Sequence, residues 1–259
     1  MPTLSLAIQK GGSGKTTTAV NLAAALQQMG KRVLLVDLDP QANLTQALGL
    51  LDEVEPSIYH LLQQEAAGRK ADLRSIITER SGLPLVPASL ELAGAELELV
   101  SVYGREQILT RLLKPLRQEY EFILIDCPPA IGMLTVNALV ASDHVIIPLN
   151  AEFLAWNGLK SFLRHFDLIK NSLHKKLDIL GFVLTRFDPR KTMNRSVQER
   201  LIKEFGPKVF HTVIRVNIAL AQAQEKGLDI FHHDMSAHGA VDHLELAQEV
   251  LGRLKKNGP

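Results

Sequence analysis

The chain has 259 residues, 46% of them hydrophobic and 22% charged, with a formal net charge of +1. This composition is typical of a globular protein with a full core, and a single cysteine, Cys127, excludes an internal disulfide framework. The sequence has no apolar run of about 18 residues that would span a membrane and no signal-peptide pattern at its start, so we expect a cytoplasmic protein.

The order of apolar segments predicts an α/β fold. Short apolar runs typical of buried parallel strands occur at 4–8, 33–37, 83–87, 122–126, 144–149 and 178–185. Apolar residues at helical spacing predict helices at 15–29, 88–100, 105–119, 132–141, 156–172, 194–205 and 239–254. This alternation predicts a doubly wound, mostly parallel sheet flanked by helices. We expect one domain over 1–259, in which the acidic segment 50–82 lacks a clear strand and forms a helical excursion.

The first predicted strand leads into a glycine-rich loop, QKGGSGKTTT (9–18), and a helix follows. This context is typical of a P-loop, in which backbone N–H groups and a helix N-terminus surround phosphate oxygens. Lys15 is expected to reach the β- and γ-phosphates of a nucleotide, Thr16 to bind Mg²⁺, and Thr17 to donate to the α-phosphate. The predicted phosphate-binding residues are Gly11, Gly12, Ser13, Gly14, Lys15, Thr16 and Thr17.

Aspartates stand at the carboxyl ends of two other predicted strands. Asp37 and Asp39 belong to VLLVDLD, and Asp126 ends FILID. Asp126 is the candidate Walker B acid, which holds Mg²⁺ through a water, and Asp39 is placed to orient or deprotonate the attacking water. Asp37 is expected to have a structural or supporting role. The sequence therefore predicts a nucleotide hydrolase with Thr16, Asp126 and Asp39 around Mg²⁺.

Lys10 is a second lysine in a loop that already has one. The standard pattern G-x-x-x-x-G-K-[ST] has a glycine where this chain has Gln9, and Lys10 follows it. A lysine that crossed a dimer interface to the partner's γ-phosphate would act like an arginine finger, which raises the rate roughly 10³–10⁵-fold. The alternative is a surface lysine beside a glycine turn, and the spacing alone does not separate the two.

Four segments resemble the deviant Walker A ATPases, and among them the ParA/Soj type: KGGSGKTTTAVNLAAAL, VLLVDLDPQANLTQALGL, FILIDCPPAIGMLTVNAL and HVIIPLNAEFLAWNGL. The resemblance extends over nearly the whole chain. It implies ATP and Mg²⁺ as cofactors and an ATP sandwich dimer in which Lys10 contacts the partner's nucleotide and Gly11 lies at the interface. It also implies that Asp39 is required for hydrolysis, beside the catalytic Lys10 and Lys15, and that Asn217 contacts the adenine.

The resemblance further implies a working cycle. ATP dimerises the protein, and the homodimer binds DNA without sequence preference. A ParB-like or other cargo-bound protein stimulates slow hydrolysis, and the ADP form leaves the DNA. The protein would then be nucleoid-associated in its ATP state and would segregate or position a chromosome, a plasmid or another large cargo.

Basic charge is concentrated in residues 160–215, which contain 13 Lys and Arg against 5 Asp and Glu, a net charge of +8. Such a segment is either a set of solvated helix faces or a surface for a polyanion. By resemblance, Arg190 matches a DNA-binding arginine. The candidate DNA contacts are Arg186, Arg190, Lys191, Arg195 and Arg215. The chain departs from the family pattern at Val216 and Ala219, where arginines are usual.

Two other functions share this loop. A MinD-like ATPase cycles on a membrane or scaffold without binding DNA, and it needs a C-terminal amphipathic helix that inserts bulky apolar residues into lipid. The tail HLELAQEVLGRLKKNGP has no aromatic residue, so we expect a helix packed on the sheet. A biosynthetic ligase of the dethiobiotin synthetase type has a related fold, and its turnover would depend on a second substrate.

Overall fold

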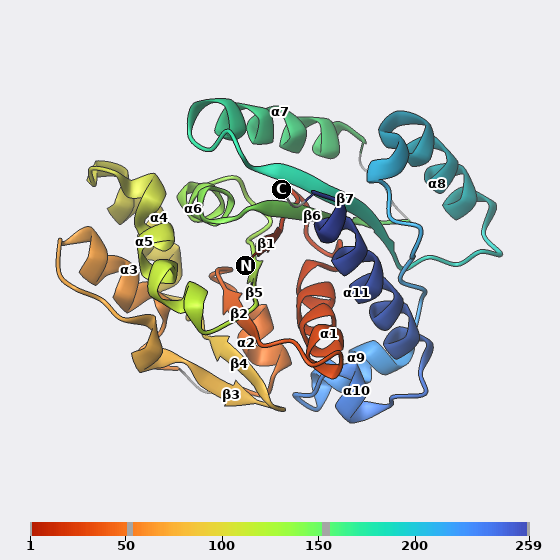
Figure 1. Ribbon diagram of the computed structural model, residues 1–259, viewed down its shortest axis with the longest axis horizontal. Coiled ribbons are helices and arrows are strands. Elements are labelled where there is room, and N and C mark those ends of the chain that lie inside the picture. The colour runs from red at the N-terminus through yellow and green to blue at the C-terminus, as the bar shows by residue number, and fades with distance from the viewer. Residues whose placement is uncertain (1, 51–53, 152–155, 258–259) are drawn as a thin grey trace.

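Figure 1 shows the computed structural model of the chain, which describes residues 2–50, 54–151 and 156–257. Within these residues, seven strands form one sheet in the order β3-β4-β2-β5-β1-β6-β7. β3 is antiparallel to β4, and the other neighbouring pairs are parallel. The strands are β1 (Thr3–Leu6), β2 (Val33–Asp37), β3 (Thr78–Arg80), β4 (Leu83–Val86), β5 (Phe122–Asp126), β6 (His144–Asn150) and β7 (Asp178–Thr185). The predicted doubly wound, mostly parallel sheet is confirmed.

Helices cover both faces of this sheet (Figure 1). One hydrophobic cluster joins the sheet to α3 (Ile58–Ala66), α4 (Leu92–Glu98), α5 (Ile108–Leu113), α6 (Met133–Ala141), α7 (Trp156–Ser172) and α8 (Thr192–Phe205). A second cluster joins it to α1 (Lys15–Gln28), α2 (Asn43–Ala47), α9 (Ile218–Glu225), α10 (Ile230–His233) and α11 (His238–Asn257). Short 3₁₀ helices are η1 (Leu73–Ile76), η2 (Leu99–Ser101), η3 (Arg105–Gln107), η4 (Lys114–Gln118) and η5 (Gly206–Lys208).

β2 explains why the strands have apolar sequences on both faces. Leu34 and Val36 belong to the first cluster, whereas Val33 and Leu35 belong to the second. Successive side chains of a strand point to opposite faces, and both faces of a parallel sheet are covered by helices. Each residue of β2 is therefore buried, and the strand is a continuous apolar run that ends in Asp37.

The differences from the expected elements concern short segments. β3 lies within 50–82, where no strand was expected; its sequence Thr-Glu-Arg is polar and sits at the edge of the sheet. α2, α9 and α10 were not predicted either. The expected helix over 105–119 consists of η3, α5 and η4, and Pro115, which has no N–H to donate, lies in the first turn of η4.

The strand order brings three sequence-distant strand ends together. β1 and β2 both pair with β5, and the register places Leu6 and Asp37 opposite Asp126. The loop that follows β1 therefore starts beside the aspartates that end β2 and β5. In open α/β sheets this carboxyl edge is where ligands bind.

Candidate functional site

The glycine loop joins β1 to α1 and is fixed by β7. Gly12 and Gly14 have φ angles of 69° and 87°, a region in which a side chain is strained. A Cβ on Gly14 would also lie 3.1 Å from the methyl carbon of Thr185, the last residue of β7. The Thr185 hydroxyl donates to the backbone oxygen of Ser13 (2.8 Å). The loop therefore needs glycine at position 14, and Thr185 holds its shape.

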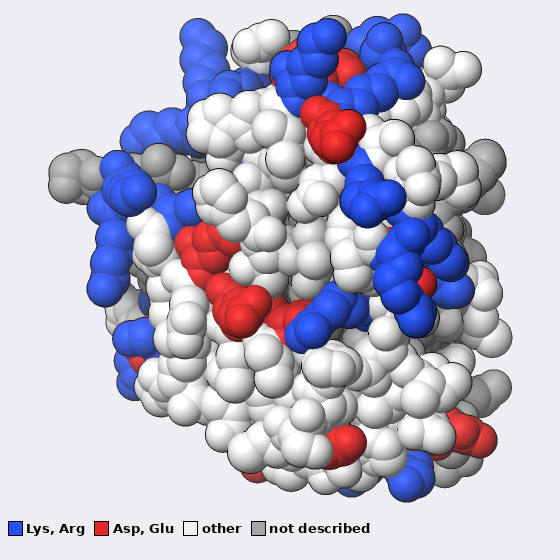
Figure 2. All heavy atoms as spheres, turned by 90° about the vertical axis from the view of Figure 1, so that its right-hand side faces the viewer, with Lys and Arg blue, Asp and Glu red and all other residues white. Residues whose placement is uncertain are grey.

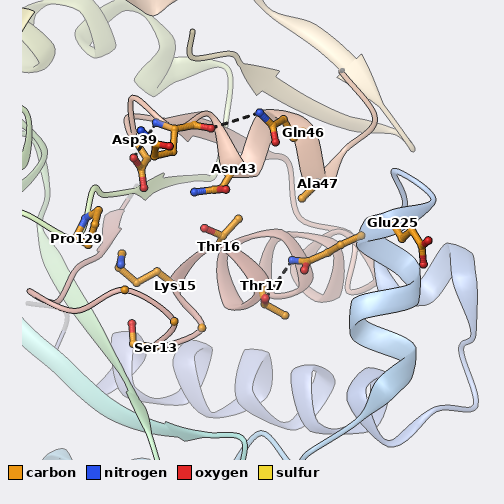
Figure 3. A pocket seen from close by; sticks show the side chains of 15 residues that line it. Ser13, Lys15, Thr16, Thr17, Asp39, Asn43, Gln46, Ala47, Pro129 and Glu225 are labelled. Carbon is orange, nitrogen blue, oxygen red and sulfur yellow. Dashed lines mark hydrogen bonds between the residues drawn. The ribbon is translucent and has the colours of Figure 1, made fainter. Parts of the chain in front are cut away.

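Lys15 lies over this loop at the start of α1. Its ammonium donates to the backbone oxygen of Lys10 (3.2 Å), which the Ser13 hydroxyl also approaches (3.3 Å). Lys15 is almost fully buried and lines a cavity of about 600 Å³. Figure 3 shows Lys15 and Thr16 facing the same hollow as Asp39 and Asn43, which lie on its opposite wall. The cavity thus has a cation and the glycine loop on one side and a carboxylate on the other.

Thr16 lines the cavity and contacts the fully buried Asp126. The Thr16 hydroxyl donates to Asp126 Oδ2 (2.6 Å), and Asp126 Oδ1 is buried without a hydrogen-bond partner among the described residues. Burial raises the pKa of Asp126 to about 8, the Asp37 carboxylate adds to the rise, and the Thr16 hydrogen bond and Lys15 oppose it. Mg²⁺ takes hydroxyl, carboxylate and water oxygens. These two side chains fit it, because a Mg²⁺-bound water would satisfy the unpartnered oxygen.

Asp37 and Asp39 have different surroundings. Asp37 accepts hydrogen bonds from Thr45 N (2.9 Å), Thr45 Oγ1 (2.7 Å) and Asp39 N (3.1 Å). Burial raises the pKa of Asp37 to about 6, although these bonds lower it. Asp37 therefore positions α2 through Thr45. Asp39 is also buried but lines the cavity, and its Oδ1 accepts from Gln41 N (3.0 Å).

Lys10 occupies a different place from Lys15. It is partly buried, which lowers the pKa of its ammonium, and it is not among the described residues that line the cavity. The adjacent Gly11 does line the cavity and is exposed, and a Cβ on it would meet no atom within 4 Å. Within one protomer, nothing described here crowds Gly11.

A second cavity of about 400 Å³ lies beside the first and shares Gly12, Gly14, Thr17 and Gln224 with it. Asn217 lines this second cavity and caps α9 by accepting a hydrogen bond from Ala219 N (2.8 Å) on its side-chain oxygen. The Gln224 side chain donates to the Thr17 hydroxyl (3.0 Å), the contact drawn in Figure 3. The two cavities therefore meet at the glycine loop and at Gln224.

The predicted DNA residues fall into two groups. Arg186, Arg190, Lys191 and Arg195 are exposed on the loop after β7 and on α8. Arg190 forms a bidentate pair with Asp188 (both contacts 3.0 Å), which lowers the pKa of Asp188 to about 2. Arg215 lies apart from them in a bidentate pair with the buried Asp242. Arg215 is therefore held by a buried carboxylate of α11.

Figure 2 shows the face of the molecule beside α8 and α11. Lys and Arg gather in its upper half, the level of α8 in Figure 1, and its lower half is largely uncharged. Acidic side chains lie among the basic ones, as the pairing of Arg190 with Asp188 requires. Of the two departures noted in the sequence, Val216 is exposed, whereas Ala219 is buried.

Known proteins resemble this chain over nearly its whole length. A family model described as an AAA domain matches residues 1–179. The sporulation initiation inhibitor protein Soj of Bacillus subtilis is 45% identical over 245 residues, which are 93% of this chain and 95% of Soj. The chromosome partitioning protein ParA of Caulobacter vibrioides is 39% identical, covering 96% of this chain and 94% of ParA. The chain belongs to the ParA/MinD superfamily of P-loop ATPases.

A solved structure supports the cofactors of this ParA/MinD-type ATPase. The crystal structure of cobyrinic acid a,c-diamide synthase from Mycobacterium smegmatis with bound ADP and magnesium has a TM-score of 0.86 and 34% identity. The match covers 100% of this chain and 97% of the synthase. The protein is an ATPase that uses ATP and Mg²⁺, and it is of the partition or positioning type.

Sequence reasoning missed several residues of the two cavities. Gln41, Asn43 and Gln46 line the first cavity, and they directly follow the DLDP motif, which was the available signal. Gln224 was missed because its contact with Thr17 joins residues 207 positions apart. The sequence contains only a weak indication of Gln224: it stands seven residues after Asn217, so both residues lie on one side of α9.

Proposed function

We propose that this protein is an ATP-dependent dimeric switch that binds DNA without sequence preference and positions a cargo. The observation that carries the proposal is the division of the loop between its two lysines. Lys15 is buried over the phosphate cavity, whereas Lys10 stands outside its lining beside the exposed, uncrowded Gly11. A second protomer packed against Gly11 would bring its Lys10 to the γ-phosphate, so ATP would join the two chains.

The catalytic roles follow from the same geometry. Lys15 neutralises the β- and γ-phosphates of its own subunit, and Thr16 and Asp126 hold Mg²⁺, directly and through a water. Asp39 faces the cavity and orients the attacking water. Asn217 supports the adenine in the second cavity. Mg²⁺ supplies charge neutralisation at the β- and γ-phosphate oxygens when it is bound.

The DNA surface of the proposed dimer is built from Arg186, Arg190, Lys191 and Arg195. Phosphate contacts from such side chains release counterions, so affinity depends on salt rather than on sequence. We place Arg215 at the edge of this surface, since Asp242 holds part of its guanidinium. A cargo-bound ParB-like protein stimulates hydrolysis, and the protein is cytoplasmic and nucleoid-associated only in its ATP state.

Binding to random-sequence duplex DNA tests this proposal. The protein is titrated with ATP, with ADP and without nucleotide, at about 50 and about 200 mM salt. We expect binding only with ATP, weakened roughly 10³–10⁵-fold at the higher salt if about 6–10 phosphates are contacted. Asp39→Ala should stay on DNA after ATP is added, because it holds ATP without hydrolysing it. Equal binding in all three nucleotide states would refute the switch.

The MinD-like alternative requires a last helix that is available for lipid. Within α11, Leu246, Ala247 and Val250 are fully buried in the cluster shared with α1. Among the described residues, no helix is both long and apolar enough to cross a bilayer. The contacts of α11 favour the DNA proposal over membrane cycling. Sedimentation with vesicles of anionic lipid distinguishes the two, since DNA-binding protein should stay in the supernatant.

The likeness to a diamide synthase raises a biosynthetic alternative. Such an enzyme consumes ATP only with its second substrate, whereas a partition ATPase hydrolyses ATP slowly alone. The 45% identity with Soj exceeds the 34% identity with the synthase, and this favours the partition function. Phosphate release from ATP with no other small molecule present is therefore expected.

A further inference from the structure

α4 and η2 carry apolar side chains on two sides, and only one side is packed. Leu92, Ala95 and Leu99 are buried in the first cluster. Leu90, Leu97 and Val100 are 69%, 81% and 53% exposed, and Ala93 between them is exposed too. Ala93 and Leu97 lie four residues apart on one side of α4, and Leu90 before the helix and Val100 in η2 continue the same spacing. Tyr103, fully exposed, extends the series. We call these five residues the α4 ridge.

The border of the α4 ridge is acidic. Residues 91–107 contain four glutamates and one arginine, Arg105, which pairs with Glu106 (3.3 Å). Glu98 is held at the border by hydrogen bonds from Tyr59 Oη and Gln63 Nε2, both 2.9 Å. Glu91 lies on the same border with about half of its side chain exposed. Apolar surface edged by fixed carboxylates is complementary to an amphipathic segment with basic flanks.

The fourth glutamate, Glu96, connects this helix to the ATP site. Its carboxylate accepts hydrogen bonds from Met133 N (2.5 Å) and Leu134 N (3.2 Å), so it caps the first turn of α6. A Cβ on Gly132 would overlap this carboxylate, so Glu96 would have to shift if a larger residue stood at position 132. The loop before Gly132 contains Pro129, which lines the phosphate cavity, and follows Asp126. A shift of α4 would therefore move the loop that joins the metal ligand to α6.

We propose that the α4 ridge is the docking surface for a basic amphipathic helix of the ATPase-stimulating partner, and that Glu96 transmits this docking to the loop after Asp126. This inference rests on the proposed function, whose cycle needs a stimulating partner. Figure 1 shows α4 and α8 at opposite ends of the molecule, so a partner on the ridge leaves the basic surface open to DNA. The partner can then act on the DNA-bound form.

A synthetic peptide tests the surface. The probe is a fluorescent helix of about 20 residues, long enough to be helical, with Leu at helical spacing and Lys or Arg elsewhere. Its twin has Glu in place of every basic residue. With Mg·ATP and full-length protein, we expect the basic peptide to bind and to raise the rate of phosphate release. Leu97→Ser should weaken this binding about tenfold, as expected for a central apolar anchor.

Leu168→Ser is the matched control, because Leu168 is 64% exposed on α7, away from the ridge. It should bind the basic peptide like the wild type. Wild-type affinity in Leu97→Ser, an equal loss in Leu168→Ser, or equal binding of the acidic twin would overturn the docking surface. Loss of ATP-dependent dimers in Leu97→Ser would also overturn it, because the ridge would then contact a second copy.

Glu96→Gln tests the connection to the ATP site. Glu96 lies outside the ridge, so the variant should bind the peptide normally and lose most of the increase in phosphate release. Full stimulation in this variant would refute the transmission through Glu96. DNA binding with ATP is measured on the same samples. Its absence in the wild type would refute the proposed function. Peptide binding tests the α4 ridge independently of that result.

Discussion

Lys10 and Lys15 belong to one loop but have different surroundings. Lys15 donates to the backbone oxygen of Lys10, so the chain around Lys10 forms part of the support for Lys15, while the Lys10 side chain lies outside the cavity lining. Lys10→Ala keeps that backbone oxygen. We therefore expect it to bind Mg·ATP as a monomer with nearly wild-type affinity and to dimerise at least about tenfold more weakly, the loss of one charge-assisted contact.

Lys15→Ala is the companion variant, and it should lose nucleotide binding itself. Calorimetry gives the nucleotide affinity, and analytical ultracentrifugation with ATP gives the dimer constant. A Lys10→Ala protein that dimerises like the wild type would contradict the role of Lys10 across the interface.

The raised pKa of Asp126 predicts that the stability of the protein without Mg²⁺ depends on pH. Its pKa is raised from 3.8 to about 8 in the folded state, chiefly by burial. Between these values the folded protein binds more protons than the unfolded chain, so this group's contribution to stability is lost as the pH rises to about 8. Through this group, the free energy of unfolding falls by at most about 1.4 kcal/mol per pH unit.

Urea unfolding at about pH 6 and about pH 8, compared between the wild type and Asp126→Asn, isolates this slope from that of Asp37. The wild type should lose more stability than the variant, and added Mg·ATP should reduce the loss. Parallel pH profiles in the two proteins would show that Asp126 is already ionised at neutral pH.

From the sequence we predicted those residues of the site that lie close together along the chain. The loop 9–18 contains its own glycines, Lys15 and Thr16. Asp37 and Asp126 were placed by the strands that they end, and Asp39 by the end of β2 two residues before it. The contacts of Thr185 with Ser13 and of Gln224 with Thr17 join residues 172 and 207 positions apart. Such contacts depend on how β7 and α9 pack, and no local pattern in the sequence contains that information.

At the scale of elements, local sequence patterns also explain which helices and strands were predicted. Strands buried on both faces have continuous apolar runs, and long helices show a helical period. β3 has three polar residues at an edge, and α2 and α10 have five and four residues, too few for a period to show. α9 has eight residues and no clear amphipathic period, although Ala219 and Leu220 pack in the second cluster.

α11 is attached to the sheet by Arg253. The guanidinium of Arg253 donates to the backbone oxygens of Leu180 (2.9 Å), Lys208 (3.1 Å) and Val209 (2.7 Å), and it stacks on Phe210 at 3.9 Å. Arg253→Met keeps most of the packing volume and leaves these oxygens without their donor. We expect the free energy of unfolding to fall by about 1–3 kcal/mol.

Lys255→Met, an exposed position in the same last turns, is the control and should change stability by less than about 0.5 kcal/mol. Urea unfolding followed by circular dichroism measures both. Unchanged stability in Arg253→Met would show that the apolar contacts of Leu246, Ala247 and Val250 hold α11 in place without this arginine.

At the scale of the molecule, the concentration of basic charge was visible in the sequence, but its arrangement was not. The pairing of Arg215 with Asp242 joins residues 27 positions apart and removes one candidate from the open surface. Arg190 keeps an exposed guanidinium even in its pair with Asp188, since its side chain is 89% exposed. Arg190 is therefore the position at which the proposed DNA surface is best tested.

Arg190→Glu places a like charge beside Asp188 and beside the approaching phosphates. We expect ATP-dependent dimers to form normally, because Arg190 lies on the loop before α8 and not on the glycine loop. DNA affinity should fall at least about tenfold, and the slope of log affinity against log salt should become shallower by about the equivalent of one phosphate contact per subunit. Lys70→Glu is the same charge reversal at an exposed position outside residues 160–215. It should keep both the DNA affinity and its salt dependence. An equal loss in the two variants would show that only net charge matters, and the surface around α8 would not be the one that meets DNA.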